Sequence, residues 1–324
     1  MKTIKIGLLG LGNIGTGTYK TLEMNRSEIE STLNAKVEIV KILERDTERD
    51  RGITVPKEKF TSDPDEIFQD PEIDIVIELL GGIEPATTFM LSALKNGKHV
   101  VTANNAALAA NYHELINTAK ENNVILRFEA SVGGGIPILG TLTGPLRANK
   151  FEEVMGILNG TTNYILTMMT KEGLDYETAL KDAQEQGFAE ADPTADVEGI
   201  DAANKLTILM ALMFDKYVAP KDIPTTGITE ITKEKIEEAR SNGCKIKLIA
   251  HAWRDENDEI KYEVRPMYIS ATHPLANINK EFNAVFVKGN AVDDVMFYGK
   301  GAGPLPTGSA VLGDVIDISM MILK

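Results

Sequence analysis

Apolar and polar positions alternate in blocks along the first half of the chain. Short runs rich in Val, Ile and Leu are separated by segments of helical or turn character, such as residues 87–96 and 112–122. The expected strands cover residues 3–9, 37–43, 73–79, 100–102 and 124–128. Because strands that alternate with helices are joined by right-handed crossovers, this pattern predicts a mostly parallel sheet.

The second half of the chain contains longer apolar or alternating runs between polar turns. Strands are expected over residues 154–158, 245–254, 260–267 and 284–288, with a hairpin loop at 255–259. Helices are expected over residues 164–169, 201–213 and from about residue 307 onward. These runs predict an antiparallel sheet that carries helices.

A glycine-rich turn follows the first expected strand directly. Gly10, Gly12 and Gly15 form a GxGxxG string between a strand and a helix, which is the context that binds a dinucleotide. Gly10 permits the tight turn, Gly12 lets a pyrophosphate approach the backbone, and Gly15 allows close packing of helix on strand. The helix N-terminus, with Asn13 and Ile14, supplies amide donors for phosphates. A purely structural glycine turn is the alternative.

The fold class that these patterns predict is α/β, with a Rossmann-type doubly wound parallel sheet and a second α+β domain. A length of 324 residues is long for one hydrophobic core and fits two domains. We assign residues 1–135 plus 301–324 to the dinucleotide-binding domain, because the last helix is expected to return there. Residues 136–300 are assigned to substrate binding and dimerisation.

Composition narrows the classes of partner. A net charge of −14 disfavours binding to nucleic acid or to an anionic membrane, because phosphates are repelled. The single cysteine, Cys244, excludes an intrachain disulfide, and the N-terminus lacks the pattern of a signal peptide. No apolar stretch is expected to reach the roughly 20 residues that cross a bilayer. We therefore expect a cytoplasmic protein that binds small molecules or copies of itself.

Side chains at the carboxyl ends of the parallel strands are candidates for cofactor contacts. Thr102 ends the fourth expected strand, Asn105 comes shortly after it, and Gly303 precedes the last helix. The second strand ends in Glu44 and Arg45. An acid at this position bonds the ribose hydroxyls of NAD, whereas an arginine accommodates the extra phosphate of NADP. Arg45 favours NADP, while Glu44 keeps NAD open.

An acidic run with one lysine is the strongest candidate for chemistry. Residues 183–205, AQEQGFAEADPTADVEGIDAANK, place six carboxylates ahead of Lys205. Acids on loop and helix can bind the amine of a small substrate, and Lys205 can donate a proton. The alternative is an acid-rich surface on which Asp201 and Lys205 form an ordinary i,i+4 pair worth about 0.2–0.5 kcal/mol.

Two further segments combine polar groups with glycine. Residues 159–163, NGTTN, stand at a strand-helix junction and either bind a polar ligand or cap the helix. Residues 129–137, EASVGGGIP, form a loop whose carbonyl groups and one carboxylate can bind a hard monovalent cation or simply turn the chain.

Taken together, these motifs resemble homoserine dehydrogenases along essentially the whole chain. The similar segments, in the family's order, are GLGNIG at 10–15, ILNGTTNY at 157–164, the acidic run at 183–205 and GAGPLPTGSAV at 301–311. The resemblance implies NAD(P)-dependent interconversion of L-homoserine and L-aspartate 4-semialdehyde, in the biosynthesis of threonine, methionine and isoleucine. It also implies a homodimer.

The resemblance also implies residue roles. Lys205 is expected to donate the proton to the carbonyl oxygen, and Glu190 to hold the substrate amine. Asp196 and Asp201 are expected to orient the amine, the lysine or a water molecule. Gly160 and Thr161 are expected to line the same pocket. The family's sodium ion maps to four residues, which are Glu129, Val132, Gly134 and Ile136.

Asn105 departs from the family pattern. In the segment VTANNAALA, the family has a lysine where Asn105 stands, and that lysine is associated with the cofactor and the catalytic centre. Asparagine donates a hydrogen bond but carries no charge and cannot shuttle a proton. Loss of a positive charge beside a developing alkoxide costs about 2.7–4 kcal/mol of transition-state stabilisation, on the scale of one oxyanion donor.

Two alternative functions stay open at this point. An aspartate-semialdehyde dehydrogenase requires an activated cysteine, for which Cys244 is the only candidate. A dinucleotide-binding protein with little activity is the second alternative, and it draws its support from Asn105. Many relatives continue into a small regulatory domain that binds an end-product amino acid, and no such segment follows Ile322 in this sequence. We therefore expect a short form of the enzyme that threonine does not inhibit allosterically.

Overall fold

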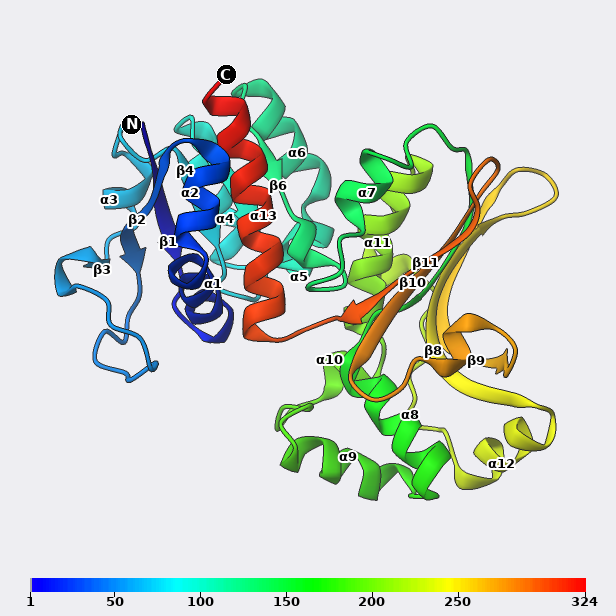
Figure 1. The fold of residues 1–324 in the computed structure, drawn as a ribbon. Coiled ribbons are helices and arrows are strands. Elements are labelled where there is room, and N and C mark those ends of the chain that lie inside the picture. Colours follow the sequence, from blue (N-terminus) through cyan, green and yellow to red (C-terminus); the bar gives the residue numbers. More distant parts are fainter. Residues whose placement is uncertain (1) are drawn as a thin grey trace. The chain divides into compact units, whose positions relative to one another are not determined.

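The computed structural model describes residues 2–324 and divides into two compact units (Figure 1). Unit 1 comprises Met1–Gly135 and Ala302–Lys324, and unit 2 comprises Ile136–Gly301. The boundary that we expected after residue 300 lies one residue later.

Unit 1 is built on a six-stranded parallel sheet with the strand order β3-β2-β1-β4-β5-β6. The doubly wound parallel sheet predicted from the sequence is confirmed, and the order changes direction between β1 and β4. Ligands of such folds bind at the carboxyl edge near this point. The strands are β1 (Thr3–Leu9), β2 (Lys36–Leu43), β3 (Phe60–Thr61), β4 (Ile75–Glu78), β5 (His99–Thr102) and β6 (Leu126–Arg127).

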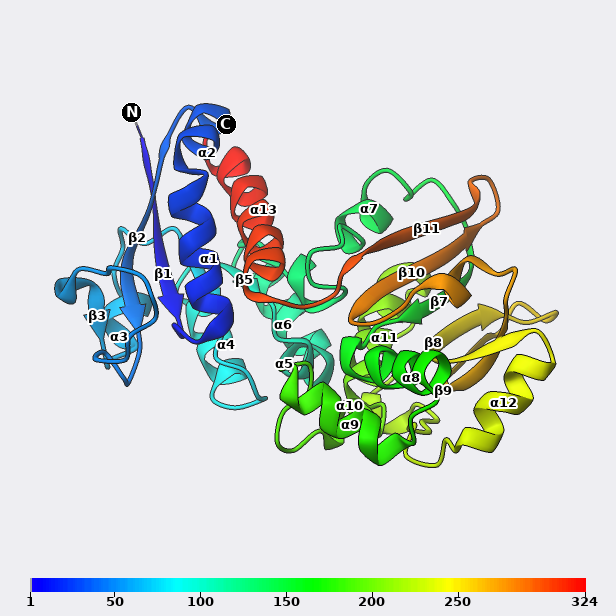
Figure 2. The same ribbon diagram turned by 60° about the horizontal axis from the view of Figure 1, so that its bottom comes forward.

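Helices cover both faces of this sheet (Figures 1 and 2). Ile4, Ile6 and Leu8 of β1 share one core with α1 (Asn13–Met24), α2 (Arg26–Leu33) and α13 (Pro304–Ile322). Gly7, which points to the opposite face, lies against Ile67 of α3. The helices associated with that face are α3 (Asp65–Phe68), α4 (Ala86–Lys95) and α6 (Tyr112–Glu121), while α5 (Asn105–Ala110) follows β5.

Helix α13 corrects one expectation. Its 19 residues are long and apolar enough to cross a membrane by length and composition, although no such stretch was expected. In unit 1, however, Val311, Leu312, Val315 and Ile318 of this helix belong to the hydrophobic core. Packing inside unit 1 therefore accounts for the buried apolar residues of α13, while Leu305, Met320 and Met321 are exposed.

Unit 2 contains a five-stranded antiparallel sheet with the order β11-β10-β7-β8-β9. Its strands are β7 (Phe151–Ile157), β8 (Cys244–Arg254), β9 (Ile260–Ser270), β10 (Phe282–Gly289) and β11 (Asp293–Lys300). Strand β11 was not predicted, because it is an edge strand whose residues alternate between exposed and half-buried. Strand β11 extends to Lys300, so the glycine-rich segment before α13 begins at Gly301.

Helices of unit 2 carry most of the polar motifs. They are α7 (Leu139–Thr143), α8 (Gly160–Glu172), α9 (Tyr176–Glu185), α10 (Thr194–Val197), α11 (Ile200–Phe214) and α12 (Lys233–Ser241). Both α8 and α11 pack against β8. The predicted helices over 164–169 and 201–213 are thus α8 and α11, with α8 longer at both ends.

Gly17 allows α1 and α13 to approach each other closely. A Cβ at position 17 would lie 2.2 Å from the carbonyl oxygen of Pro304, which is backbone and cannot rotate away. We predict that Gly17→Ala lowers stability by on the order of 1–3 kcal/mol, the usual cost of overpacking a core. Urea unfolding followed by circular dichroism measures the change.

Gly313→Ala is the matched control for this substitution. Gly313 lies in α13, the helix that Gly17 of α1 approaches, and a Cβ at position 313 meets no atom within 4 Å. Because alanine is favoured over glycine in a helix by about 1 kcal/mol, this variant is expected to be at least as stable as the parent chain. Equal stability of Gly17→Ala and Gly313→Ala would contradict the close approach of the helices.

Candidate functional site

The glycine turn of unit 1 leaves backbone amides open at the start of α1. Gly10 has a positive φ of 92°, and a Cβ on Gly15 would lie 2.2 Å from the Gly10 carbonyl oxygen. Both positions therefore require glycine for the turn. Gly12 is the N-cap of α1, and Gly12 and Asn13 are exposed. Free amides at a helix N-terminus are suited to binding phosphate groups.

Glu44 holds this turn in place from the end of β2. Its carboxylate accepts hydrogen bonds from the amides of Leu11 (3.0 Å), Arg45 (2.8 Å) and Asp46 (3.1 Å). Arg51 completes the arrangement, since its guanidinium lies 3.2 Å from Glu44 and its Nε donates to the Leu11 carbonyl at 2.7 Å. Burial opposes ionisation of Glu44, but the Asp46 and Leu11 amides and the Arg51 charge lower its pKa. Glu44 is thus a structural acceptor of the turn.

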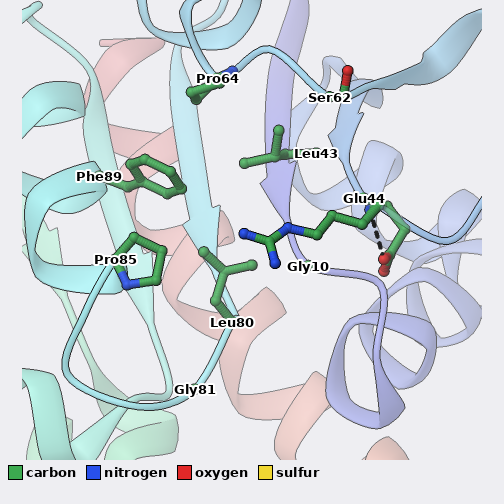
Figure 3. Close-up of a pocket in the computed structure, with 10 residues that line it drawn as sticks. Gly10, Leu43, Glu44, Ser62, Pro64, Leu80, Gly81, Pro85 and Phe89 are labelled. Carbon is green, nitrogen blue, oxygen red and sulfur yellow. Dashed lines mark hydrogen bonds between the residues drawn. The ribbon is translucent and has the colours of Figure 1, made fainter.

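A cavity of about 320 Å³ opens beside the turn, at the carboxyl edge of the sheet (Figure 3). Figure 3 shows apolar side chains around it from three segments, including Leu43, Leu80 and Phe89. Arg45 and Ser62 add polar groups to the lining. Within residues 2–324, no hydrogen bond or ion pair occupies the Arg45 guanidinium. An apolar cavity with a few polar groups is typical of a site for a small ligand.

Glu78 organises the neighbouring loops, a role that no sequence pattern predicted. This fully buried carboxylate at the end of β4 accepts from the Leu80 amide and from the Thr102 hydroxyl, both at 2.7 Å. Burial raises its pKa, against the effect of these hydrogen bonds. Asn104 extends the network, because its side chain donates to the Gly82 carbonyl (2.7 Å) and caps α5. Asn105, the first residue of α5, is positioned by this network.

Lys205 and Asp201 form the centre of the polar cluster in unit 2. Both lie on α11, and Nζ of Lys205 is 2.6 Å from Oδ2 of Asp201. Nζ also donates to the carbonyl oxygen of Leu158 at 2.7 Å, and Lys205 is only 9% exposed. The i,i+4 pair is thus not an exposed surface pair, since a backbone acceptor from the end of β7 holds the same amine.

Asp196 is tied to this pair through Asn159. The Asn159 amide donates to Oδ1 of Asp196 (2.7 Å) and to Oδ2 of Asp201 (3.0 Å). The Thr161 hydroxyl approaches the second oxygen of Asp196 at 2.9 Å. Burial raises the pKa of Asp196 and the nearby Asp201 charge adds to the rise, while Asn159, Thr161 and Lys205 oppose it. Asn159 belongs to the NGTTN motif, but its bridging role was not predicted.

The structure brings most, but not all, of the predicted substrate residues together. Thr161, Asp196, Asp201 and Lys205 form one hydrogen-bonded cluster, and Gly160 begins α8 beside it. Glu190 lies on the exposed turn between α9 and α10. In residues 2–324, the Glu190 carboxylate makes no hydrogen bond or ion pair with this cluster.

The predicted sodium ligands stay a prediction. Among the described residues, no cluster of three or more His, Cys, Asp or Glu side chains is placed to hold a metal ion. Val132, Gly134 and Ile136 can offer only carbonyl oxygens, and Glu129 adds a carboxylate. Such hard oxygen donors fit a hard cation. The backbone amide of Glu129 is held by Asp314 at 2.8 Å.

Comparison with known proteins assigns a family to each unit of the chain. Residues 10–129 match the NAD-binding domain of homoserine dehydrogenase, and residues 137–316 match the homoserine dehydrogenase family. The homoserine dehydrogenase of Bacillus subtilis is 45% identical over 98% of this chain and 73% of its own length. The chain belongs to the homoserine dehydrogenase family.

Solved structures agree with this assignment. A homoserine dehydrogenase from Thiobacillus denitrificans has a TM-score of 0.96 and 42% identity, covering 99% of this chain and 74% of that one. A hyperthermophilic archaeal homoserine dehydrogenase in complex with NADPH has a TM-score of 0.82 and 25% identity, covering 98% of both chains.

The protein is therefore an NAD(P)-binding oxidoreductase that interconverts L-homoserine and L-aspartate 4-semialdehyde in amino-acid biosynthesis. The family assignment decides against an aspartate-semialdehyde dehydrogenase. Cys244, which that alternative required, stands at the start of β8, where its thiol contacts the Asn242 carbonyl oxygen at 3.5 Å.

Proposed function

We propose that Lys205 is the proton donor of this homoserine dehydrogenase. The bound nicotinamide cofactor supplies the hydride that reduces the aldehyde carbon. Lys205 protonates the carbonyl oxygen, so that a hydroxyl group forms, and the reverse reaction returns the proton to the amine. The observation that supports this role is the fixed position of Nζ between Asp201 Oδ2 and the Leu158 carbonyl oxygen. These two acceptors leave one of the three N–H bonds for a substrate oxygen.

Glu190 is our candidate for binding the substrate amine. Its carboxylate is exposed, whereas Oδ1 of Asp196 already accepts a hydrogen bond from Asn159. Oδ2 of Asp196 lies 2.9 Å from the Thr161 hydroxyl, whose single hydrogen is shared with the Phe188 carbonyl oxygen at 2.6 Å. We assign Asp196 to the orientation of the cluster and Asp201 to the orientation of Lys205. An exposed carboxylate can form a charge-assisted hydrogen bond with an ammonium group at little desolvation cost.

NADP is our choice of cofactor over NAD. Glu44, which would bond the ribose hydroxyls of NAD, is already engaged by three backbone amides and Arg51. Arg45 lines the cavity with its guanidinium free, and Ser62 lies on the same lining. A guanidinium group is suited to a phosphate because it donates in bidentate geometry. The homodimer, the bound sodium ion and the cytoplasmic location stay predictions.

Removal of the Lys205 amine tests the proton donor. We predict that Lys205→Ala lowers kcat for reduction of the semialdehyde by about 10²–10⁴-fold, the usual contribution of a general acid. The absorbance of the reduced nicotinamide reports the rate. Lys221→Ala is the control, because Lys221 is an exposed lysine of the same unit. Retention of kcat within a few-fold in Lys205→Ala would rule out this proton donor.

Removal of the Arg45 guanidinium tests the choice of cofactor. We predict that Arg45→Ala weakens NADP⁺ binding by about 10–100-fold, equivalent to about 1.5–3 kcal/mol for a hydrogen bond to a charged group. Binding of NAD⁺, which lacks the phosphate, is expected to change little. Isothermal titration calorimetry measures both dissociation constants. Arg49→Ala, another exposed arginine of this loop, is the control, and an equal loss for NAD⁺ and NADP⁺ would contradict the assignment.

Restoring the family lysine tests the effect of Asn105. We predict that Asn105→Lys raises kcat by about 10²–10³-fold, because a cation near the developing alkoxide stabilises the transition state. Steady-state assays with L-homoserine measure the gain. Ala106→Lys is the matched control, since it adds the same charge one residue later in α5. Unchanged turnover of Asn105→Lys would show that position 105 does not limit the reaction.

A further inference from the structure

Asn159 uses every hydrogen-bonding group of its side chain, although it is a single buried residue between β7 and α8. Its Oδ1 accepts from the amide and the hydroxyl of Thr162, at 2.9 Å and 3.1 Å, and so caps α8. Its Nδ2 donates to Oδ1 of Asp196 at 2.7 Å and to Oδ2 of Asp201 at 3.0 Å. An amide nitrogen has two hydrogens, and both are used on carboxylates. The oxygen and the nitrogen of this side chain therefore serve different purposes.

The acceptor shared by Asn159 and Lys205 connects the two residues. Oδ2 of Asp201 accepts from Nδ2 of Asn159 at 3.0 Å and from Nζ of Lys205 at 2.6 Å. The residue before Asn159 contributes as well, because the Leu158 carbonyl oxygen accepts from Nζ at 2.7 Å. One dipeptide at the end of β7 thus contacts both the amine of Lys205 and the carboxylate that binds it.

The charges around Asn159 explain why a neutral donor stands there. The ionisable groups of the cluster are Asp196 on α10, and Asp201 and Lys205 on α11. Two carboxylates that share a site repel each other, which favours protonation of one of them. An amide that donates to both carboxylates compensates for this repulsion without adding charge.

We propose that Asn159 is a positioning residue for proton transfer, whose amide holds the carboxylates of Asp196 and Asp201 side by side and thereby fixes Nζ of Lys205. This inference rests on the proposed role of Lys205. It differs from a helix cap alone, because capping requires only Oδ1, whereas positioning requires Nδ2.

Two substitutions separate these functions. Asn159→Asp keeps an acceptor for the Thr162 amide, and aspartate is as good an N-cap as asparagine, but it replaces the two donor hydrogens with a third carboxylate. Asn159→Ser also keeps a good N-cap and adds no charge, yet its short hydroxyl cannot donate to both acids. Asp175→Asn is the matched control, because Asp175 caps α9 by accepting from the Thr178 amide at 2.8 Å.

Steady-state reduction of the semialdehyde over a range of pH is the decisive measurement. We expect kcat to fall by about tenfold or more in Asn159→Asp and in Asn159→Ser, within the range that a correctly held general acid contributes. Only Asn159→Asp is expected to regain activity relative to the parent chain as the pH falls, because a protonated carboxyl group can donate a hydrogen bond. The NADP⁺ dissociation constant from calorimetry is expected to stay close to that of the parent chain, as in Asp175→Asn. The melting temperature of both Asn159 variants is expected to fall, because two carboxylates lose a shared donor.

Each other outcome has a definite meaning. If Asn159→Ser and Asn159→Asp both keep kcat and its pH profile, Asn159 is only a helix cap and the inference is wrong. If Asn159→Asp fails to fold, Asn159→Ser decides the question alone. The outcome of Lys205→Ala is independent: loss of activity there, with full activity in both Asn159 variants, would retain the proton donor and reject the positioning role.

Discussion

The ion pair between Lys205 and Asp201 is the interaction on which the substrate site depends. Two charges that leave water lose hydration, and their attraction compensates for this loss only when further hydrogen bonds satisfy both groups. The chain meets this condition with the end of β7, where the Leu158 carbonyl oxygen binds the amine and the Asn159 amide binds the carboxylate. The pair therefore connects α11 to the end of β7. Asn159, which binds Asp201, is also the N-cap of α8.

Carboxylates also satisfy backbone groups in unit 1, at the carboxyl edge of the parallel sheet. Loops that leave the carboxyl ends of parallel strands have amides that no sheet ladder satisfies. Carboxylates accept them here, since the half-buried Glu44 binds the Leu11 amide and the buried Glu78 binds the Leu80 amide. Both acids are thereby structural, and the groups left for a ligand are the open amides of α1, the guanidinium of Arg45 and the apolar walls of the cavity (Figure 3).

Local patterns predicted the elements that carry these groups, within limits that have physical causes. The run at 3–9 became β1 with the same bounds, because Ile4, Ile6, Leu8 and Leu9 are buried apolar residues and a glycine turn ends the strand. Strand β11 was not predicted because it lies at the edge of the antiparallel sheet, where its residues are exposed or half-buried and do not form an apolar run. Glu44 was read as a candidate for the ribose, since the sequence cannot show that Arg51 and the amide of Leu11 occupy it.

The sequence by itself determined the parallel sheet with its glycine turn, the spacing that places Asp201 and Lys205 on one face of a helix, and the resemblance to homoserine dehydrogenases. These features are encoded within a few residues of one another, so periodicity and motif reveal them. Only the tertiary structure decided which groups surround Lys205. Asn159 meets Asp196 and Asp201 across 37 and 42 residues of chain, and such contacts follow from how β7, α10 and α11 pack together, which no local pattern specifies.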